Sequence, residues 1–313
     1  MKGLELSEAF YEEFGRPMLE REFPDLLPYL AVGLFGGGSE CFGYDDEISR
    51  DHDFEPGFCI FLPDEETVDR RSAFLLERAY AKLPRSFRGF EREMMLPVGG
   101  ARHGVLRTGE FFLKTAGTAD GVLSLEQWLS IPEEALAEAT NGSVFYDNFG
   151  EVTGIRQALA AFPEDIWLKR LAGNLLLMAQ AGQYNYPRCL GHGEPAAAQM
   201  AVYEFTKSAL AAVFLLNERY QPYYKWVFRA MRELPELSGL AEPLEYLLTT
   251  GNQKEMIPDK TRIIEEVADA IVKKLKETGL TRVGGQELER HAYSVNDRIK
   301  NAELRNMHIL SAV

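Results

Sequence analysis

Two aspartates that stand two positions apart, Asp51 and Asp53, have the clearest potential for chemistry in this sequence. They lie at the mouth of a run, residues 55–62, that predicts a strand, and the period of two in a strand places both side chains on one face. Two carboxylates about 4–6 Å apart repel each other by roughly 3–4 kcal/mol at an effective dielectric constant near 20, so the pair needs a proton, a cation or a metal ion. Their hard oxygen atoms suit Mg²⁺, which keeps its other positions for water and phosphate oxygens. We therefore expect a magnesium site at Asp51 and Asp53.

A glycine turn lies upstream of these aspartates. The segment YLAVGLF, residues 29–35, predicts a short buried strand that leads directly into Gly36, Gly37, Gly38 and Ser39. Glycines let the backbone approach a ligand closely, and exposed N–H groups in such a turn form a cradle for an anion. We expect Gly37, Gly38 and the hydroxyl of Ser39 to hold phosphate. A phosphate site beside a metal site indicates a nucleoside triphosphate as ligand.

Other phosphate-binding, metal-binding and hydrolase motifs do not fit this segment. The stretch from Gly33 to Ser39 lacks the lysine of a P-loop, and no G-x-G-x-x-G follows the strand. A hydrolase elbow would need glycine in place of Cys41. An EF-hand loop would need glycine in place of Pro56.

The string GSECFGYDDEISRDHDF resembles the signature of the polymerase-β superfamily of nucleotidyltransferases, a Gly-Ser turn followed about a dozen residues later by Asp-x-Asp. Here these are Gly38-Ser39 and Asp51-His52-Asp53. Together with LNERYQPYYKW at residues 216–226, the string looks like a bacterial branch of that superfamily known mainly as a domain of unknown function. The layout is similar to that of the kanamycin-type antibiotic nucleotidyltransferases, which join a catalytic domain to a helical bundle. The resemblance covers most of residues 30–230.

The resemblance implies transfer of a nucleoside monophosphate from ATP or another NTP to a hydroxyl or phosphate of an unknown acceptor, with release of pyrophosphate. Two Mg²⁺ ions would stabilise the attacking and departing oxygens. Asp51 and Asp53 would bind both ions, and a third carboxylate would bind the catalytic ion and take the proton of the acceptor. We assign the third position to Asp147, at the end of a predicted strand over residues 143–146, and keep Glu110 and Glu93 as alternatives.

Three residues of the C-terminal half are further candidates for binding the nucleotide. Lys207 lies in the otherwise apolar helix expected at residues 195–219, where an ammonium group needs a partner or a polar cleft. Glu204 would supply that partner if Lys207 has no functional role. Tyr224 and Lys225 follow that helix, where an aromatic ring can stack on a base and a lysine can contact the triphosphate. Packing between helices explains the aromatic residues equally well.

The order of predicted elements gives the fold class α+β. Strands are expected at residues 29–35, 55–62, 87–92, 104–112 and 143–146, and helices at residues 6–22, 64–83 and from Ser124 onward in that half. Beyond about residue 152 the pattern is helical throughout, with helices at 153–161, 164–184, 195–219, 222–233, 239–250, 259–278 and 285–308. We therefore predict a mixed-sheet nucleotidyltransferase domain over residues 1–152 and an all-helical bundle domain over residues 153–313.

Composition limits the partners of this protein. The 313 residues carry a net charge of −14, which disfavours a protein that coats nucleic acid and argues against an RNA acceptor. We favour a small-molecule acceptor over protein or RNA, although no residue pattern decides between a protein and a metabolite. The longest apolar stretch, Ala209 to Leu216, is far too short to span a bilayer, so we expect no membrane partner and a cytoplasmic location. The sequence does not indicate an oligomeric state.

The alternative function is that of a catalytically silent nucleotide-binding or antitoxin-like interaction protein. Such a protein would keep the fold and lose turnover. The intact pair of Asp51 and Asp53 argues against this alternative, because a silent protein has no need to keep clustered acids.

Overall fold

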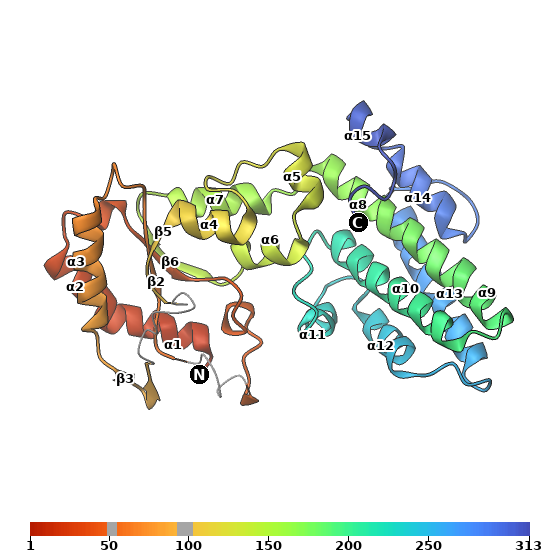
Figure 1. Cartoon of the computed structure of the whole chain (residues 1–313), viewed down its shortest axis with the longest axis horizontal. Coiled ribbons are helices and arrows are strands. Elements are labelled where there is room, and N and C mark those ends of the chain that lie inside the picture. Colours follow the sequence, from red (N-terminus) through yellow and green to blue (C-terminus); the bar gives the residue numbers. More distant parts are fainter. Residues whose placement is uncertain (49–54, 93–102) are drawn as a thin grey trace. The chain divides into compact units, whose positions relative to one another are not determined.

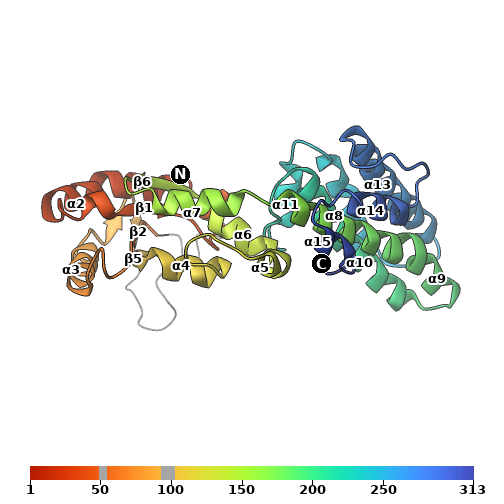
Figure 2. The same ribbon diagram turned by 90° about the horizontal axis from the view of Figure 1, so that it is seen from above.

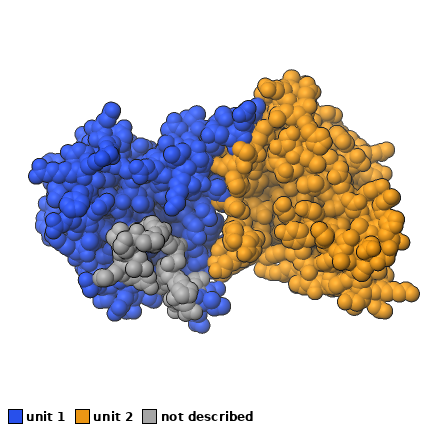
Figure 3. Space-filling model, viewed as in Figure 1, with its two compact units in different colours: residues 1–127, 135–161 blue, residues 128–134, 162–313 orange. Residues whose placement is uncertain are grey.

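The computed structural model describes residues 1–48, 55–92 and 103–313. The protein is α+β, as predicted, with a small mixed sheet in its N-terminal half and helices elsewhere (Figure 1). Its chain forms two units, residues 1–127 with 135–161 and residues 128–134 with 162–313 (Figure 3). The boundary predicted after residue 152 falls inside helix α7 (Glu151–Ala160), all of which belongs to the first unit. Within the described residues, no helix has the length and apolar character needed to cross a membrane.

The first unit begins with a helical segment that packs on the sheet. Helix α1 (Gly3–Phe10), a π-helical turn (Tyr11–Gly15) and α2 (Arg16–Glu22) follow one another without a break and confirm the helix predicted at residues 6–22. Gly15 is required at the contact, because a Cβ atom at this position would lie 2.4 Å from the ring of Phe58.

Four strands form the sheet in the order β5-β2-β1-β6. Strand β1 (Ala31–Leu34) is antiparallel to both neighbours, β2 (Cys59–Leu62) and β6 (Ser143–Asp147), while β2 is parallel to β5 (Gly104–Arg107). Strands β1 and β6 approach closely at Gly33, where a Cβ atom would lie 2.6 Å from the carbonyl oxygen of Ser143. A separate hairpin pairs β3 (Ser86–Phe87) with β4 (Phe90–Glu91).

Helices cover both faces of the sheet. Val32 and Ile60 point to one side and share a core with Phe10 of α1 and with α3 (Arg70–Ala81). On the other side, the ring of Phe35 stacks on Phe61 at a centroid distance of 4.7 Å, beneath α4 (Thr108–Ala116). Figure 1 shows α2 and α3 on one side of the strands and α4 and α7 on the other. The two central strands, β1 and β2, are therefore buried on both faces, whereas β6 is half-buried.

Three predicted elements of this half differ from the structure. The single strand predicted at residues 87–92 is the hairpin of β3 and β4, with positive φ angles at Arg88 and Gly89. Only residues 104–107 of the strand predicted at 104–112 are extended, and Thr108 begins α4, which buries Thr108, Phe112 and Ala116 at helical spacing. The helix predicted at residues 64–83 begins at Arg70, because Asp69 accepts a hydrogen bond from the N–H of Ser72 at 2.7 Å and caps it.

The helices of the second unit surround two long central ones. Helices α8 (Glu164–Met178) and α10 (Pro195–Leu216) lie side by side in both views (Figure 1, Figure 2). A π-helical turn (Ala179–Asn185) connects α8 to the next helix. The remaining helices of the chain are α5 (Leu125–Ser130), α6 (Glu133–Thr140), α9 (Tyr186–Gly191), α11 (Val227–Arg232), α12 (Ala241–Thr249), α13 (Ile257–Glu277), α14 (Leu288–Asn296) and α15 (Ala302–Asn306).

The helix predicted at residues 285–308 is interrupted between α14 and α15. The carboxylate of Asp165 accepts hydrogen bonds from the N–H groups of Lys300 and Asn301, at 2.9 and 2.8 Å. Asn301 then caps α15 by accepting from the N–H of Leu304. Tertiary contacts to α8 therefore determine where this helical segment breaks.

Candidate functional site

The glycine turn follows β1, as predicted, and the loop after α6 fixes its conformation. Gly36 has φ of 127°, which is in the region that favours glycine. The side chain of Asn141 accepts a hydrogen bond from the N–H of Gly36 at 2.9 Å and donates one to its carbonyl at 2.8 Å. Arg156 in turn donates to the carbonyl oxygen of Asn141 at 2.6 Å. The entry to the turn is therefore held by a chain of side-chain contacts.

The next residues of the turn present backbone donors. The N–H groups of Gly37 and Gly38 donate no hydrogen bond to any part of the chain that the structure describes. Gly37 is exposed, and a Cβ atom there would lie 3.2 Å from the carboxylate of Glu138. Ser39 is half-buried, and its carbonyl closes the turn by accepting from the N–H of Tyr44 at 2.9 Å. The turn thus offers donors of the kind that bind anions.

A cavity of about 520 Å³ opens beside this turn, lined by Gly36 to Gly38, by β5 and by α4. Two cationic side chains, Arg107 and Lys114, contribute to its wall. Arg107 is held in place, because it donates to the carbonyl oxygens of Pro63 and Asp64 at 2.7 and 3.1 Å. Lys114 is exposed and forms no hydrogen bond or ion pair within the described residues. Its ammonium group is therefore available to a ligand in this cavity.

Sequence reasoning missed Lys114. The residue lies one helical turn after Glu110 on α4, and that relationship is visible in the sequence only if residues 108–116 are interpreted as a helix. Because a strand was predicted at residues 104–112, the helical spacing of Glu110 and Lys114 was not considered.

Carboxylates also line this cavity, namely Glu40, Glu77 and Glu110. Glu110 was one of the alternatives for the third acidic position, and the structure brings it to the same cavity as the glycine turn. Within the described residues, however, no three His, Cys, Asp or Glu side chains gather closely enough to hold a metal ion.

Asp51, Asp53 and the alternative Glu93 lie outside the described residues. The sheet register nevertheless bears on the strand that follows the two aspartates. Gly33 near the end of β1 pairs with Cys59, the first residue of β2. Since the strands are antiparallel, the first residue of β2 lies next to the end of β1 that leads into the glycine turn.

The structure does not bring Asp147, the predicted third carboxylate, to the glycine turn. Strand β6 runs antiparallel to β1, so Asp147 pairs with Ala31 at the start of β1, whereas the turn follows Leu34 at its other end. Both carboxylate oxygens accept hydrogen bonds at 2.7 Å, one from the N–H of Gly150 and one from the N–H of Thr153. Asp147 therefore anchors the start of α7.

A buried histidine–glutamate pair, also missed from the sequence, joins the residues that precede β2 and β5. The Nδ1 atom of His103 lies 3.0 Å from Oε1 of Glu55, and the side chain of His103 is 6% exposed. Gly57 lies against the imidazole, since a Cβ atom there would be 2.7 Å from the ring. This pair fixes the two strand beginnings to each other.

In the second unit, Lys207 lies on an exposed part of α10 and not in the bundle core. Most of α10 is buried, as predicted, but Met200 and Tyr203 share the exposed side with Lys207. The lysine lines a cavity of about 200 Å³ together with Arg170 and Gln221. It makes no hydrogen bond or ion pair within the described residues, so the expected pair with Glu204 does not form.

Tyr224 and Lys225 lie in the loop between α10 and α11 and do not line that cavity. The ring of Tyr224 is 74% exposed and lies 4.2 Å from the ring of Tyr223 between centroids. Lys225 places its ammonium group 4.8 Å from the ring centroid of Trp226. An exposed aromatic pair is compatible with base stacking, but these two residues and Lys207 do not line one common cavity.

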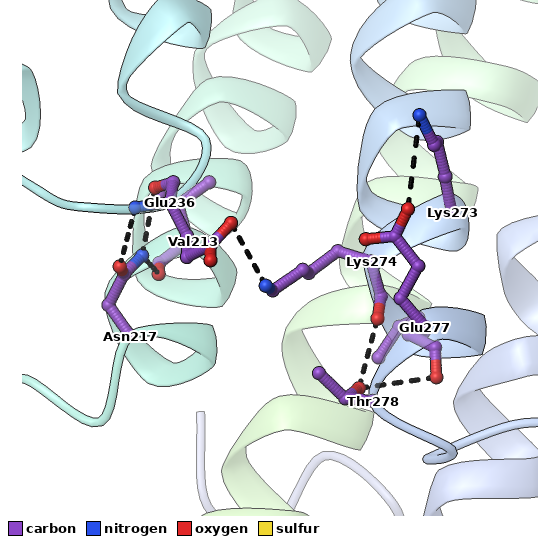
Figure 4. Close-up of polar contacts among 8 residues, drawn as sticks. Val213, Asn217, Glu236, Lys273, Lys274, Glu277 and Thr278 are labelled. Atoms are coloured by element: carbon purple, nitrogen blue, oxygen red, sulfur yellow. Dashed lines mark hydrogen bonds and ion pairs between the residues drawn. The ribbon is translucent and has the colours of Figure 1, made fainter.

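Asn217, at the end of α10, has a structural role (Figure 4). Its side chain donates to the carbonyl of Val213 at 2.8 Å and to that of Glu236 at 3.0 Å, and it accepts from the N–H of Glu236. The carboxylate of Glu236 lies 2.9 Å from the ammonium group of Lys274 on α13. These contacts connect α10 to α13 through one loop.

Comparison with known proteins identifies one family. Residues 128–227 match a family described as a domain of unknown function (DUF4037). The match covers about a third of the chain, from α5 to the first residue of α11, and includes Lys207, Tyr224 and Lys225. No curated protein matches the chain significantly.

Proposed function

We propose that this protein is a magnesium-dependent nucleotidyltransferase. It would transfer a nucleoside monophosphate from ATP or another NTP to a hydroxyl or phosphate of an acceptor and release pyrophosphate. One observation carries the proposal: Gly37, Gly38 and Lys114 line one cavity, and within the described residues the two N–H groups donate no hydrogen bond and the ammonium group has no ion-pair partner. Backbone donors beside a lysine are the groups that bind phosphate oxygens in proteins.

We assign three carboxylates to the reaction, two from the sequence motif and one from the lining of the cavity. Asp51 and Asp53 would hold Mg²⁺, and their carboxylate oxygens are the ligands that this ion prefers. We assign the third carboxylate to Glu110, because it lines the cavity of the glycine turn while Asp147 is engaged at the start of α7. Bound Mg²⁺ would stabilise the charge that develops on the phosphate oxygens.

The remaining residues would position the substrate and move one proton. Gly37 and Gly38 would orient the triphosphate through their N–H groups, and Lys114 would neutralise part of its charge. Glu110 would accept the proton of the acceptor hydroxyl as a general base. Lys207, Tyr224 and Lys225 stay predicted nucleotide contacts of the second unit.

Isothermal titration of the full chain with ATP, with and without Mg²⁺, tests the binding part of this proposal. Pyrophosphate release with pools of small-molecule, protein and RNA acceptors then tests turnover. Asp51→Asn and Asp53→Asn should each lower turnover by on the order of 10²-fold or more, the scale observed when one group that stabilises transition-state charge is removed.

The neighbouring Asp46→Asn serves as the matched control, because the carboxylate of Asp46 accepts a local hydrogen bond from the N–H of Ile48. Full turnover in the Asp51 and Asp53 variants would contradict the metal assignment. Metal-dependent ATP binding without turnover for any acceptor pool would favour a silent nucleotide-binding protein.

A further inference from the structure

The 200 Å³ cavity of the second unit has polar walls, and Lys207 is the one lining residue that the proposed reaction names. Side chains of Asn174, Lys207, Ser208 and Gln221 line it, together with the pair of Arg170 and Glu133. All six residues lie within the segment that matches the family of unknown function. The cavity is smaller than the roughly 300–1,000 Å³ typical of sites for drug-sized ligands, so its size suits a small group.

The positive charge of Arg170 is only partly compensated. Its side chain is 6% exposed, and one terminal nitrogen donates to the carbonyl oxygens of Trp128 and Ile131 at 2.9 and 2.5 Å. The other terminal nitrogen lies 3.5 Å from the carboxylate of Glu133, a long distance for an ion pair. Its Nε atom is buried and donates no hydrogen bond within the described residues. Burial raises the pKa of Glu133, and the charge of Arg170 opposes this shift.

Lys207 adds a second positive charge with no partner in the described structure. Two acidic side chains, Glu133 and Glu134, line the cavity wall together with the last residue, Val313, and Glu134 is exposed, so solvent screens it. Glu134 also stands in the first turn of α6, where the helix dipole stabilises a negative charge. The cavity therefore combines an unpaired ammonium group, a buried guanidinium and neutral side chains that can form hydrogen bonds.

We infer that this cavity binds a small oxyanion of the phosphate class, either inorganic phosphate or the phosphate group of a monoester. Lys207 would make the direct contact, with Ser208 and Gln221 as hydrogen-bond partners. Arg170 would act through its charge, since its nitrogens are occupied or buried. The inference does not rest on the proposed nucleotidyl transfer, because the cavity lies within the second unit and shares no residue with the cavity of the glycine turn.

Isothermal titration of the full chain with inorganic phosphate and with ribose 5-phosphate tests this inference. Lys207→Gln should weaken binding about tenfold or more, the scale of one lost charged hydrogen bond. Lys273→Gln is the matched control, because Lys273 is an exposed lysine outside this cavity that pairs with Glu277. It should leave the dissociation constant unchanged.

Lys114→Gln separates this cavity from that of the glycine turn. Binding that persists in Lys114→Gln and is lost in Lys207→Gln supports the inference, and the tighter of the two ligands then identifies the source of the phosphate group. Three results overturn it: no binding to the wild-type chain, equal binding by Lys207→Gln, or loss of binding in Lys114→Gln alone. The last result would leave the proposed function intact.

Discussion

Asn141 holds Gly36 through both polar atoms of its side-chain amide, accepting from the glycine N–H at 2.9 Å and donating to its carbonyl at 2.8 Å. The two residues are 105 positions apart in the chain, and Asn141 directly follows α6. This clamp holds the entry of the glycine turn in a backbone conformation that few residues adopt, with the N–H groups of Gly37 and Gly38 following it. The shape of the turn thus depends on a residue outside the motif.

Asn141→Ala should destabilise the protein by about 1–3 kcal/mol, because it leaves the N–H and carbonyl of Gly36 without partners in a partly buried site. Urea unfolding measures this change. Asn148→Ala is the control, since Asn148 makes a single exposed contact of 3.5 Å, and it should change stability by less than about 0.5 kcal/mol. Equal stability of the two variants would show that the clamp contributes nothing.

Lys114→Gln should raise the dissociation constant for ATP about tenfold or more, because the variant removes the positive charge and keeps a polar end group. The exposed Lys82→Gln, at the end of α3, should bind ATP like the wild type. Calorimetry on both variants provides the comparison. If they bind equally well, Lys114 does not contact the triphosphate.

Asp147→Ala should lower stability by about 1–2 kcal/mol, because it removes the acceptor of two N–H groups at the start of α7. The same variant should bind ATP and Mg²⁺ with wild-type affinity, since Asp147 lies at the opposite end of β1 from the turn. Asp25→Ala, an exposed position, controls for loss of a surface charge. A selective loss of metal-dependent binding in Asp147→Ala would restore Asp147 as the third carboxylate.

The buried Lys260 should make the free energy of unfolding rise with pH in the alkaline range. The side chain is fully buried, its ammonium group donates to Gln199 and to the carbonyl of Thr250 at 2.8 Å each, and burial lowers its pKa to about 8. Between about pH 8 and the ordinary lysine pKa of 10.5, the unfolded chain holds a proton that the folded chain has lost. The contribution of Lys260 to the free energy of unfolding therefore rises with pH in this window, by on the order of 1–3 kcal/mol.

Lys260→Met should remove that rise, whereas Lys254→Met, at an exposed position nearby, should keep it. Urea unfolding at a series of pH values between 7 and 10.5 measures the difference between the two variants. If the free energies of unfolding of Lys260→Met and Lys254→Met change with pH in parallel, Lys260 does not titrate in this window.

The sequence predicted the elements well where the periodicity was unambiguous. The helical segment up to Glu22, the strands β1, β2 and β6, and the helical C-terminal half all follow from spacing of apolar residues. The error at α4 has a simple cause. Phe111 and Phe112 continue the apolar run of β5, and only burial of Thr108 and Ala116 on one helical face reveals the change of period.

The candidate site was less predictable, because tertiary register decides which side chains meet. Spacing alone did not show that Asp147 and the glycine turn lie at opposite ends of β1, which follows from the antiparallel pairing of β1 and β6. Spacing also gave no signal for the contact between Asn141 and Gly36, because the two residues are far apart in the chain and do not share a motif. The place of Lys114 beside the glycine turn, by contrast, becomes predictable once residues 108–116 are assigned to helix α4.

Diffraction from crystals grown with Mn²⁺ and a non-hydrolysable ATP analogue tests the central claim most directly. The account predicts anomalous density for manganese at the carboxylate oxygens of Asp51 and Asp53, with the triphosphate at the N–H groups of Gly37 and Gly38 and the ammonium group of Lys114. A triphosphate bound elsewhere on the chain, or manganese away from both aspartates, would contradict it.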